Sequence, residues 1–144
     1  MKAGIARVAV PAPLYRLFDY RPAPGGPVPP AGSRVVVPFG GRRLVGLVVE
    51  TAADSSVDPE RLRPVDQVLD AALLDRELLD LLTWSARYYA APPGEIVAHG
   101  LPALLRRNRP VPAPQREWLT RSPSLDPGAL ARAPRQREIA ELLD

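Results

Sequence analysis

The segment Arg34–Glu50, RVVVPFGGRRLVGLVVE, constrains the fold of this chain more than any other stretch. Two runs rich in valine, Arg34–Val37 and Leu44–Glu50, flank a tip that contains two consecutive glycines. β-Branched runs on either side of a glycine-containing loop predict an antiparallel β-hairpin. The first part of the chain is therefore predicted to be built on a β-sheet.

The tip of this hairpin carries groups that suit a nucleotide. Phe39 offers a ring for base stacking, and glycine at positions 40 and 41 lets a ligand approach the backbone. Arg42 and Arg43 can attract phosphate, although two arginines at a hairpin tip can equally be a solvated surface. The glycine pair alone is a weak indication, because most such pairs simply form turns.

Other elements follow from the periodicity of apolar residues. Strands are predicted at Ile5–Val10 and Pro64–Leu69. One long helix is predicted to begin after Asp75, a good N-cap residue, and to end at Pro92–Gly94. Aromatic residues of this helix are expected to pack against the sheet; they are Trp84, Tyr88 and Tyr89.

The composition excludes several classes of function. The 144 residues contain no cysteine, so neither a disulfide framework nor a thiolate metal site is expected. The chain has no phosphate-binding loop and no Gly-x-Gly-x-x-Gly motif, and the single histidine, His99, has no second metal ligand nearby in the sequence. We therefore expect no catalytic residue, metal or cofactor in these residues. Without a signal peptide or an apolar membrane span, the chain is predicted to be cytoplasmic.

Charge is divided unevenly along the chain. Residues 1–63 hold nine basic and five acidic side chains, residues 64–105 hold two and six, and residues 106–144 hold eight and five. The overall balance of +3 does not by itself argue for nucleic acid. The distribution instead predicts an anion-binding face on the first segment.

The character of the sequence changes after residue 105. Residues 106–114 are basic and rich in proline, as in a linker. Within residues 115–144, the runs Gln115–Leu119 and Pro134–Leu143 look like helices of a second small unit. The second run has only half of an apolar face, so we expect the chain to stop inside a second domain.

Several motifs together resemble the N-terminal part of a bacterial protein family. Their order and spacing over residues 1–105 resemble those of primosomal protein N′, the replication restart protein PriA family. Any one motif occurs by chance, but the combination is specific. The motifs are Phe18–Tyr20 (FDY), Val37–Gly40 (VPFG), Val45–Val49 (VGLVV), Val65–Asp70 (VDQVLD) and Trp84–Glu95 (WSARYYAAPPGE).

The resemblance implies an α+β fold for residues 1–105. The fold would be a small β-barrel, similar to oligonucleotide-binding barrels, with one long helix. After the linker, residues 115–144 would be an incomplete winged-helix segment. A helicase core that uses ATP, with a zinc-binding insertion, is expected only downstream of these residues, so this chain alone is not expected to be an enzyme.

The resemblance also implies a function. Members of the family bind DNA at replication forks and cap the 3′-hydroxyl end of the nascent leading strand during replication restart. The 3′-end pocket would be formed by a turn that contains Phe18 and Asp19, by Gly40 of the VPFG motif and by Arg63. Arg42 and Arg43 would make supporting phosphate contacts.

The chemistry of these residues fits that role. Asp19 can accept a hydrogen bond from a 3′-hydroxyl or from a base N–H, and it would repel a 3′-phosphate. Stacking of a base on Phe18 would contribute about 1–3 kcal/mol. Gly40 would leave room for the terminal nucleotide, and Arg63, where the family often has lysine, would hold the penultimate phosphate. Each residue also has an ordinary structural alternative. Phe18 could be a core residue, Asp19 could cap a turn, and Arg63 could be a surface charge.

Two classes of function remain open. The first is a DNA 3′-end-binding module. The second is a protein-interaction barrel, whose hydrophobic hairpin and basic tail bind a replication partner such as single-strand DNA-binding protein or another primosome component. A charged pocket beside Phe18 and Asp19 would favour the first class, and an exposed apolar patch without such a pocket would favour the second.

Overall fold

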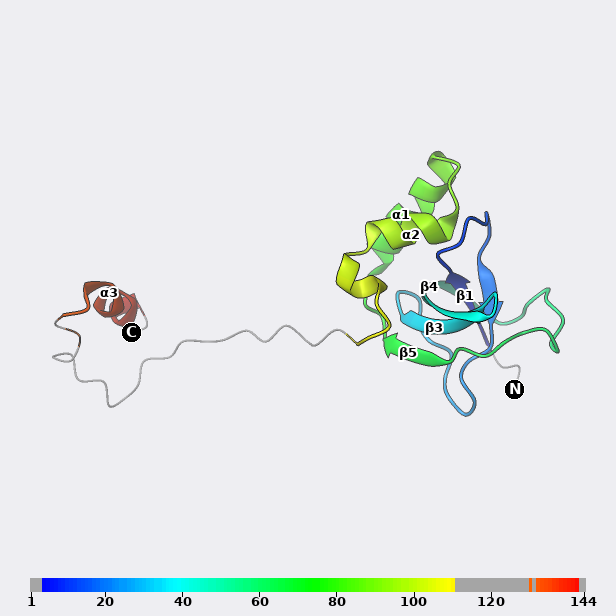
Figure 1. The fold of residues 1–144 in the computed structure, drawn as a ribbon, viewed down its shortest axis with the longest axis horizontal. Coiled ribbons are helices and arrows are strands. Elements are labelled where there is room, and N and C mark those ends of the chain that lie inside the picture. The colour runs from blue at the N-terminus through cyan, green and yellow to red at the C-terminus, as the bar shows by residue number, and fades with distance from the viewer. Residues whose placement is uncertain (1–3, 111–129, 131, 143–144) are drawn as a thin grey trace. The chain divides into compact units, whose positions relative to one another are not determined.

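The computed structural model describes residues 4–110, 130 and 132–142. The chain divides into two units, Met1–Val111 and Pro112–Asp144. The first unit has an α+β fold of five strands followed by helices (Figure 1). Its strands are β1 (Ile5–Ala9), β2 (Phe18–Tyr20), β3 (Arg34–Phe39), β4 (Arg42–Ala52) and β5 (Gln67–Asp70). Its helices are α1 (Arg76–Tyr88), α2 (Pro93–Gly100) and the 3-10 helix η1 (Ala103–Arg106).

The five strands form one antiparallel sheet in the order β2-β1-β4-β3-β5. The predicted hairpin is confirmed as β3–β4, in which Phe39 lies opposite Arg42. Its two loop residues, Gly40 and Gly41, have φ angles of +54° and +76°, as in a type I′ turn. A Cβ atom at Gly40 would meet nothing within 4 Å, so the backbone conformation is what favours glycine there.

Phe18–Tyr20 form a strand, so their predicted placement in a turn is wrong. Strand β2 pairs with β1, with Phe18 opposite Val8 and Tyr20 opposite Ala6. Because side chains alternate along a strand, Phe18 and Tyr20 face the core while Asp19 faces the other way. A strand of three residues is too short to produce a periodic signal in the sequence.

The segment just after the edge strand β2 meets the segment just before the other edge strand, β5. An isolated parallel bridge joins Arg21 to Pro64. The backbone N–H of Arg21 donates to the carbonyl of Arg63 at 2.9 Å, and that of Val65 donates to the carbonyl of Arg21 at 2.9 Å. These bonds fix the backbone of Arg63 next to the end of β2.

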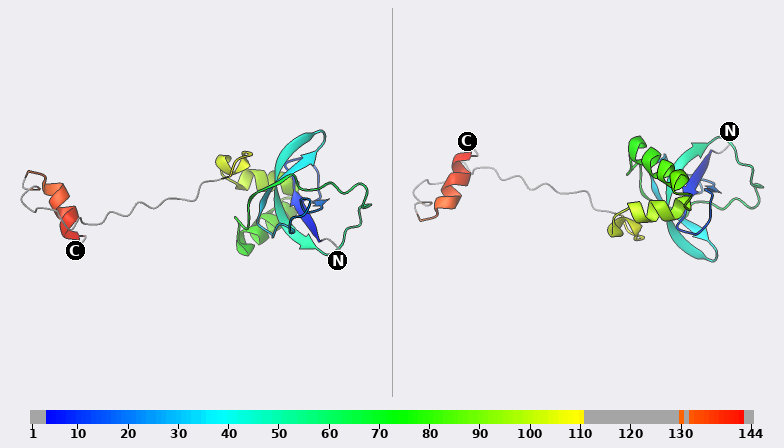
Figure 2. Two further views of the ribbon diagram at one scale, coloured as in Figure 1. Left: turned by 90° about the horizontal axis from the view of Figure 1, so that it is seen from below. Right: turned by 90° about the horizontal axis from the view of Figure 1, so that it is seen from above.

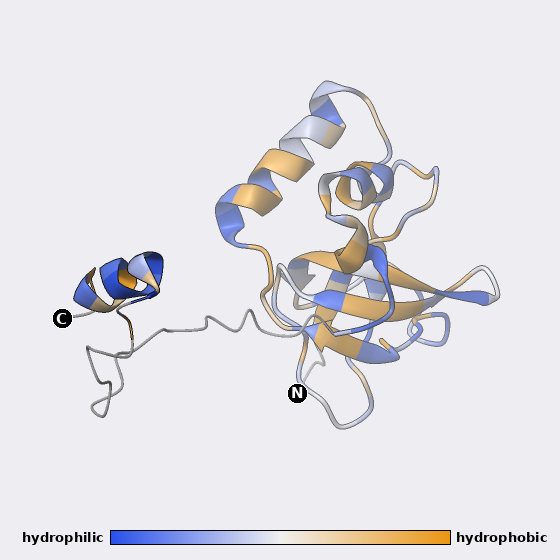
Figure 3. Cartoon of the chain, turned by 60° about the vertical axis from the view of Figure 1, so that its left-hand side comes forward, coloured by the Kyte–Doolittle hydropathy of each residue, from blue (hydrophilic) through white to orange (hydrophobic). Residues whose placement is uncertain are grey.

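Two hydrophobic clusters lie on opposite sides of the sheet. The first is rich in valine and includes Tyr20, and Phe18 packs against it. The second joins the sheet to α1 and α2 through Leu47, Leu79 and Val97. The helices lie together on one side of the sheet (Figure 2), and hydrophobic residues run along the strands and along parts of both helices (Figure 3).

Helix α1 begins as predicted, because the Asp75 carboxylate accepts a hydrogen bond from the backbone N–H of Leu78 at 2.8 Å. The prediction of a single long helix is wrong. Pro92–Gly94 separates α1 from a second helix, α2, and Pro93 stands at its first position. Proline suits that position because its missing N–H would have no partner within the helix.

The aromatic residues of α1 do not pack against the sheet, contrary to the prediction. Trp84 is 53% exposed, and Tyr88 and Tyr89 are each 67% exposed. Helix α1 instead buries Leu79 and Ala86 against the rest of the unit. Trp84 and Tyr88 stack on each other on its outer side, with ring centroids 4.8 Å apart.

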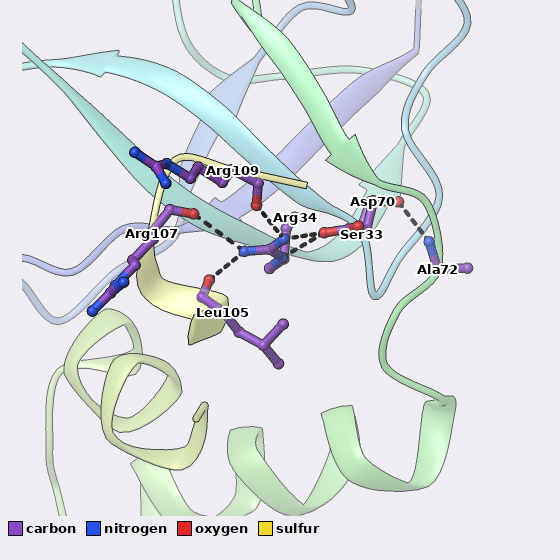
Figure 4. Close-up of polar contacts among 7 residues, drawn as sticks. All are labelled: Ser33, Arg34, Asp70, Ala72, Leu105, Arg107 and Arg109. Atoms are coloured by element: carbon purple, nitrogen blue, oxygen red, sulfur yellow. Dashed lines mark hydrogen bonds and ion pairs between the residues drawn. The ribbon is translucent and has the colours of Figure 1, made fainter. Parts of the chain in front are cut away.

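A buried arginine holds the start of the predicted linker on the first unit (Figure 4). The Arg34 side chain is 0% exposed and pairs with the carboxylate of Asp70, with Nε 2.7 Å from Oδ2. Its other guanidinium nitrogens donate to the backbone carbonyls of Leu105 (2.5 Å), Arg107 (3.3 Å) and Arg109 (3.0 Å). Residues 106–109 therefore follow η1 along a fixed path.

The second unit contains helix α3 (Pro134–Leu142), which confirms the predicted helix as far as the described residues extend. The predicted run Gln115–Leu119 lies outside the described residues. Among the helices that the structure describes, none is long and apolar enough to cross a membrane.

Candidate nucleic-acid interface

A pocket of about 580 Å³ opens beside β2, and we call it the β2 pocket. Phe18 and Asp19 line it from β2, Pro38 lines it from β3, and Arg63 lines it from the segment before β5. Three of the four residues predicted to bind a 3′ end are therefore brought together. The remaining lining residues are Arg16, Leu17, Tyr20, Ser56, Val57, Asp58 and Arg61.

The fourth predicted residue, Gly40, lines a different pocket of about 830 Å³ at the tip of the β3–β4 hairpin. This hairpin-tip pocket also contains Arg42 and Arg43. It shares Pro38 and Arg63 with the β2 pocket. The six predicted residues thus occupy two adjoining pockets, and Arg63 lines both.

Phe18 has both a structural and a potential binding role. Its half-buried ring makes an edge contact with Phe39, with ring centroids 4.9 Å apart. The guanidinium of Arg16 lies 4.9 Å from the centroid of the Phe18 ring, which is a cation–π distance. The guanidinium of Arg16 therefore lies over the ring that was predicted to stack with a base.

Asp19 is an ion-paired carboxylate with an exposed fraction of 12%. Its Oδ1 lies 3.5 Å from Nε of Arg7, and its Oδ2 accepts a hydrogen bond from the hydroxyl of Ser55. Arg7 is also bonded to Glu50 at 2.8 Å. The hydrogen bond and the charge of Glu50, with a smaller contribution from Asp19, raise the pKa of Arg7 above its ordinary value. The positive charge beside Asp19 is therefore permanent.

The predicted arginines differ in how they are held. Nε of Arg43 lies 3.0 Å from Oδ2 of Asp66, so its charge is partly compensated. Arg63 is fixed through its carbonyl, which accepts from Arg21, while its side chain is exposed. Of these residues, Arg63 alone lines both pockets, and its backbone is held while its side chain is exposed.

Tyr20 forms part of the floor of the β2 pocket. Its hydroxyl donates a hydrogen bond to the carbonyl of Pro38 at 3.1 Å and so connects β2 to β3. Burial, together with the negative charge of Asp66, raises the pKa of Tyr20 to about 12. The phenol therefore stays protonated through the whole physiological range.

The wild-type protein should lose stability at alkaline pH because of Tyr20, and we expect Tyr20→Phe to abolish that loss. The unfolded phenol loses its proton near pH 10, whereas the folded one keeps it to about pH 12. The unfolded state thus binds fewer protons in this window, so the wild-type free energy of unfolding should fall by on the order of 2 kcal/mol as the pH rises. At about pH 8, the variant should be less stable by about 1 kcal/mol because it lacks the hydrogen bond. Urea denaturation at about pH 8 and about pH 11 measures both differences, and a parallel alkaline loss in the two proteins would contradict the assignment.

The charges of the β2 pocket suit an anion that also offers a hydroxyl group. Arg16, Arg61 and Arg63 outnumber Asp19 and Asp58.

In residues 4–110, 130 and 132–142, no cluster of three His, Cys, Asp or Glu residues could hold a metal ion.

Sequence reasoning missed several of the residues that shape this site. Arg16 and Arg61 line the β2 pocket, and Arg7 and Ser55 hold the carboxylate of Asp19. Arg16 could have been suspected from its position two residues before Phe18. The others come from segments that only the folded sheet brings to the pocket, so no sequence motif marks them.

Comparison with known proteins gives a family-level match. Residues 7–102 match the family model described as the 3′ DNA-binding domain of PriA. The replication restart protein PriA of Haemophilus influenzae is 40% identical over 103 residues, which cover 71% of this chain and 14% of that protein. The protein of the same name from Synechocystis is 32% identical over 81 residues, or 54% of this chain and 10% of that protein. The chain thus spans about a seventh or less of the length of these relatives.

Proposed function

Because this chain belongs to the PriA family of replication restart proteins and contains the family's 3′ DNA-binding domain, we propose that it caps the 3′-hydroxyl end of a DNA strand at a replication fork. The fork would be one undergoing replication restart. ATP hydrolysis, zinc binding and DNA unwinding are proposed only for a longer protein of which this domain would be a part.

The observation that carries this proposal is the meeting of Phe18, Asp19 and Arg63 around the β2 pocket. The terminal base would lie against Phe18 and Arg16, where its identity matters little because every base has a π-face. The 3′-hydroxyl would donate to Asp19, and a 3′-phosphate would be repelled by the same carboxylate. Arg63 would bind the penultimate phosphate.

The strand would continue from the β2 pocket toward the hairpin-tip pocket. Arg63 lines both pockets, and Arg42 and Arg43 lie at the second one. Gly40 and Gly41 leave open space at the tip, since a Cβ atom at either position would meet nothing within 4 Å. Phosphates further from the 3′ end would therefore pass close to these arginines.

We also propose that the sheet belongs to the oligonucleotide-binding-like barrels and that residues 115–144 begin a winged-helix unit. The Arg21–Pro64 bridge supports the first idea, because it joins the segments next to the two edge strands. Helix α3 supports the second, since a winged helix needs helices in this region.

Asp19→Asn should remove the preference for a hydroxyl end. The test is fluorescence anisotropy with two single strands that differ in carrying a 3′-hydroxyl or a 3′-phosphate. We expect wild type to bind the hydroxyl end about tenfold more tightly, since the carboxylate of Asp19 repels a 3′-phosphate. The asparagine variant keeps the side-chain shape but loses the charge, so the ratio should fall close to one. Asp80→Asn, on the exposed side of α1, is the matched control and should leave the ratio unchanged.

Two outcomes would contradict the proposal. Equal and strongly salt-dependent binding of both ends would indicate a general electrostatic surface without an end pocket. Absence of binding to either strand would instead favour the second candidate, a protein-interaction module.

An observation on α1 supports that second candidate. Trp84, Tyr88 and Tyr89 are exposed, and α1 and α2 line an apolar pocket of about 370 Å³ together with residues 15–17 and Val49 of β4. A protein partner, such as single-strand DNA-binding protein, would on this proposal bind to α1 and not to the predicted hydrophobic hairpin. Loss of such a partner's binding in Trp84→Ala, but not in Asp19→Asn, would establish it as a separate surface.

A further inference from the structure

The carboxylate of Asp19 already binds a hydroxyl group of the protein itself. The Oγ of Ser55 accepts a hydrogen bond from the backbone N–H of Val57 at 3.0 Å. The hydroxyl hydrogen is therefore free to point at Oδ2 of Asp19, which lies within hydrogen-bond distance of Oγ. The direction of the bond is fixed by this arrangement: Ser55 donates and Asp19 accepts.

We propose that Ser55 acts as an internal substitute for the 3′-hydroxyl of DNA and thereby limits how strongly the site prefers a hydroxyl end over an end without a donor. In the free protein the serine hydroxyl holds Oδ2 of Asp19, and on binding a sugar hydroxyl replaces it. This inference rests on the proposed function, in which Asp19 accepts from the 3′ end.

The two oxygens of Asp19 are held by partners of different kinds. Oδ1 faces Arg7, a residue of β1 that is also tied to Glu50 of β4, so this partner belongs to the sheet. Oδ2 faces Ser55, which stands in the loop between β4 and β5. Exposed residues of the same loop, Ser56 to Asp58, line the β2 pocket. A ligand that enters the pocket therefore meets the loop that carries the exchangeable partner.

The contact explains how a nearly buried carboxylate is kept satisfied without DNA. The Asp19 side chain is only 12% exposed, so the folded protein would be destabilised if Oδ2 had no hydrogen-bond donor. Ser55 supplies that donor in the free protein. A 3′-hydroxyl supplies the same chemistry in the complex, so the exchange costs little.

The exchange also affects the relative affinities of different 3′ ends. A 3′-hydroxyl can replace the serine hydroxyl, bond for bond. A 3′-dideoxy end has no donor, so it would leave the Ser55–Asp19 bond in place. A fully ionised 3′-phosphate has no donor either, and it meets the negative charges of Asp19 and Asp58 at the pocket. Because the exchange in wild type is nearly balanced, the preference for a hydroxyl over a dideoxy end should be small there and larger without Ser55.

The test compares wild type with Ser55→Ala and with the matched control Ser85→Ala, which alters a serine of α1 that lines neither the β2 pocket nor the hairpin-tip pocket. Each protein is titrated with a linear strand ending in a 3′-hydroxyl, the same strand ending in a 3′-dideoxynucleotide, and a circular strand of equal length. In Ser55→Ala we expect the ratio of affinities, hydroxyl over dideoxy, to rise about three- to tenfold, the range of one net hydrogen bond. Ser85→Ala and the conservative variant Ser55→Thr should keep the wild-type ratio.

An unchanged or lower ratio in Ser55→Ala, with the linear strand still bound more tightly than the circle by wild type, would overturn the role of Ser55 alone. Equal binding of linear and circular strands by wild type would instead overturn the proposed end-binding function.

A second measurement needs no variant. The Val57 amide bonds to Ser55 Oγ, and Val57 also lines the pocket, so in wild type its resonance should shift with both ends, but further with the hydroxyl end, which alone replaces the serine hydroxyl. The same shift with both ends would overturn the inference.

Discussion

Replacing Arg34 with methionine should lower the free energy of unfolding by about 3–5 kcal/mol, the usual cost of breaking a buried ion pair. Methionine fills much of the volume of arginine but donates no hydrogen bonds. The variant would leave the carboxylate of Asp70 without the guanidinium that pairs with it at β5. It would also remove the guanidinium donors to the carbonyls of Leu105, Arg107 and Arg109, of which the Arg107 carbonyl keeps its bond from the backbone N–H of Arg109.

Urea denaturation followed by circular dichroism measures this effect. The matched control is Arg76→Met, because Arg76 also pairs with an aspartate, Asp80, but is 75% exposed. We expect the control to change stability by less than about 1 kcal/mol, since exposed ion pairs contribute little. The double variant with Arg34→Met and Asp70→Leu should recover part of the loss, because it no longer keeps a largely buried carboxylate that has lost its guanidinium. Equal effects of the two single variants would show that Arg34 is solvated in solution.

The role of Arg34 illustrates what sequence could not predict. In the sequence it is the first residue of a valine-rich strand, which is an ordinary place for an exposed charge. Its partners lie 36 to 75 residues further along the chain, so no local pattern contains them. Local signals did predict the β3–β4 hairpin and the start of α1, because a glycine turn and an N-cap act within a few residues.

The residues of the candidate site also fall into two groups, those that the sequence could indicate and those that only the fold shows. The resemblance supplied Phe18, Asp19 and Arg63, which the fold brings to one pocket. It did not supply Arg7 and Ser55, whose contacts with Asp19 depend on the pairing of β1 with β2 and on the course of the β4–β5 loop. A motif can therefore indicate which residues bind, while the groups that hold those residues become visible only in the folded sheet.

Helix α2 was missed for a related reason, since proline and glycine normally end helices. Here Pro92 is the N-cap residue, and Pro93 and Gly94 form the first positions of the helix. The glycine is needed because the helix starts in contact with the backbone beyond β1. A Cβ atom at Gly94 would lie 1.6 Å from the carbonyl oxygen of Val10 and 2.4 Å from its carbonyl carbon.

Gly94→Ala should accordingly destabilise the domain by about 3 kcal/mol or more, the upper range for an overpacked site. The obstacle is backbone, so no side-chain rotation can relieve it, and α2 would have to move away from β1. The sign of the change is informative, because helix propensity alone predicts that alanine stabilises a helix by about 1 kcal/mol relative to glycine.

Two other glycines provide controls for the Gly94 measurement by thermal and urea denaturation. At Gly26 a Cβ atom would come no closer than 3.4 Å to another atom, so alanine should be nearly neutral. At Gly100, in the last turn of α2, it would meet the end of the Leu82 side chain, which can rotate. Gly100→Ala should therefore cost less than Gly94→Ala, although both replace a glycine of the same helix. A stabilising effect of Gly94→Ala would mean that helix propensity outweighs packing, and that α2 does not approach β1 this closely in solution.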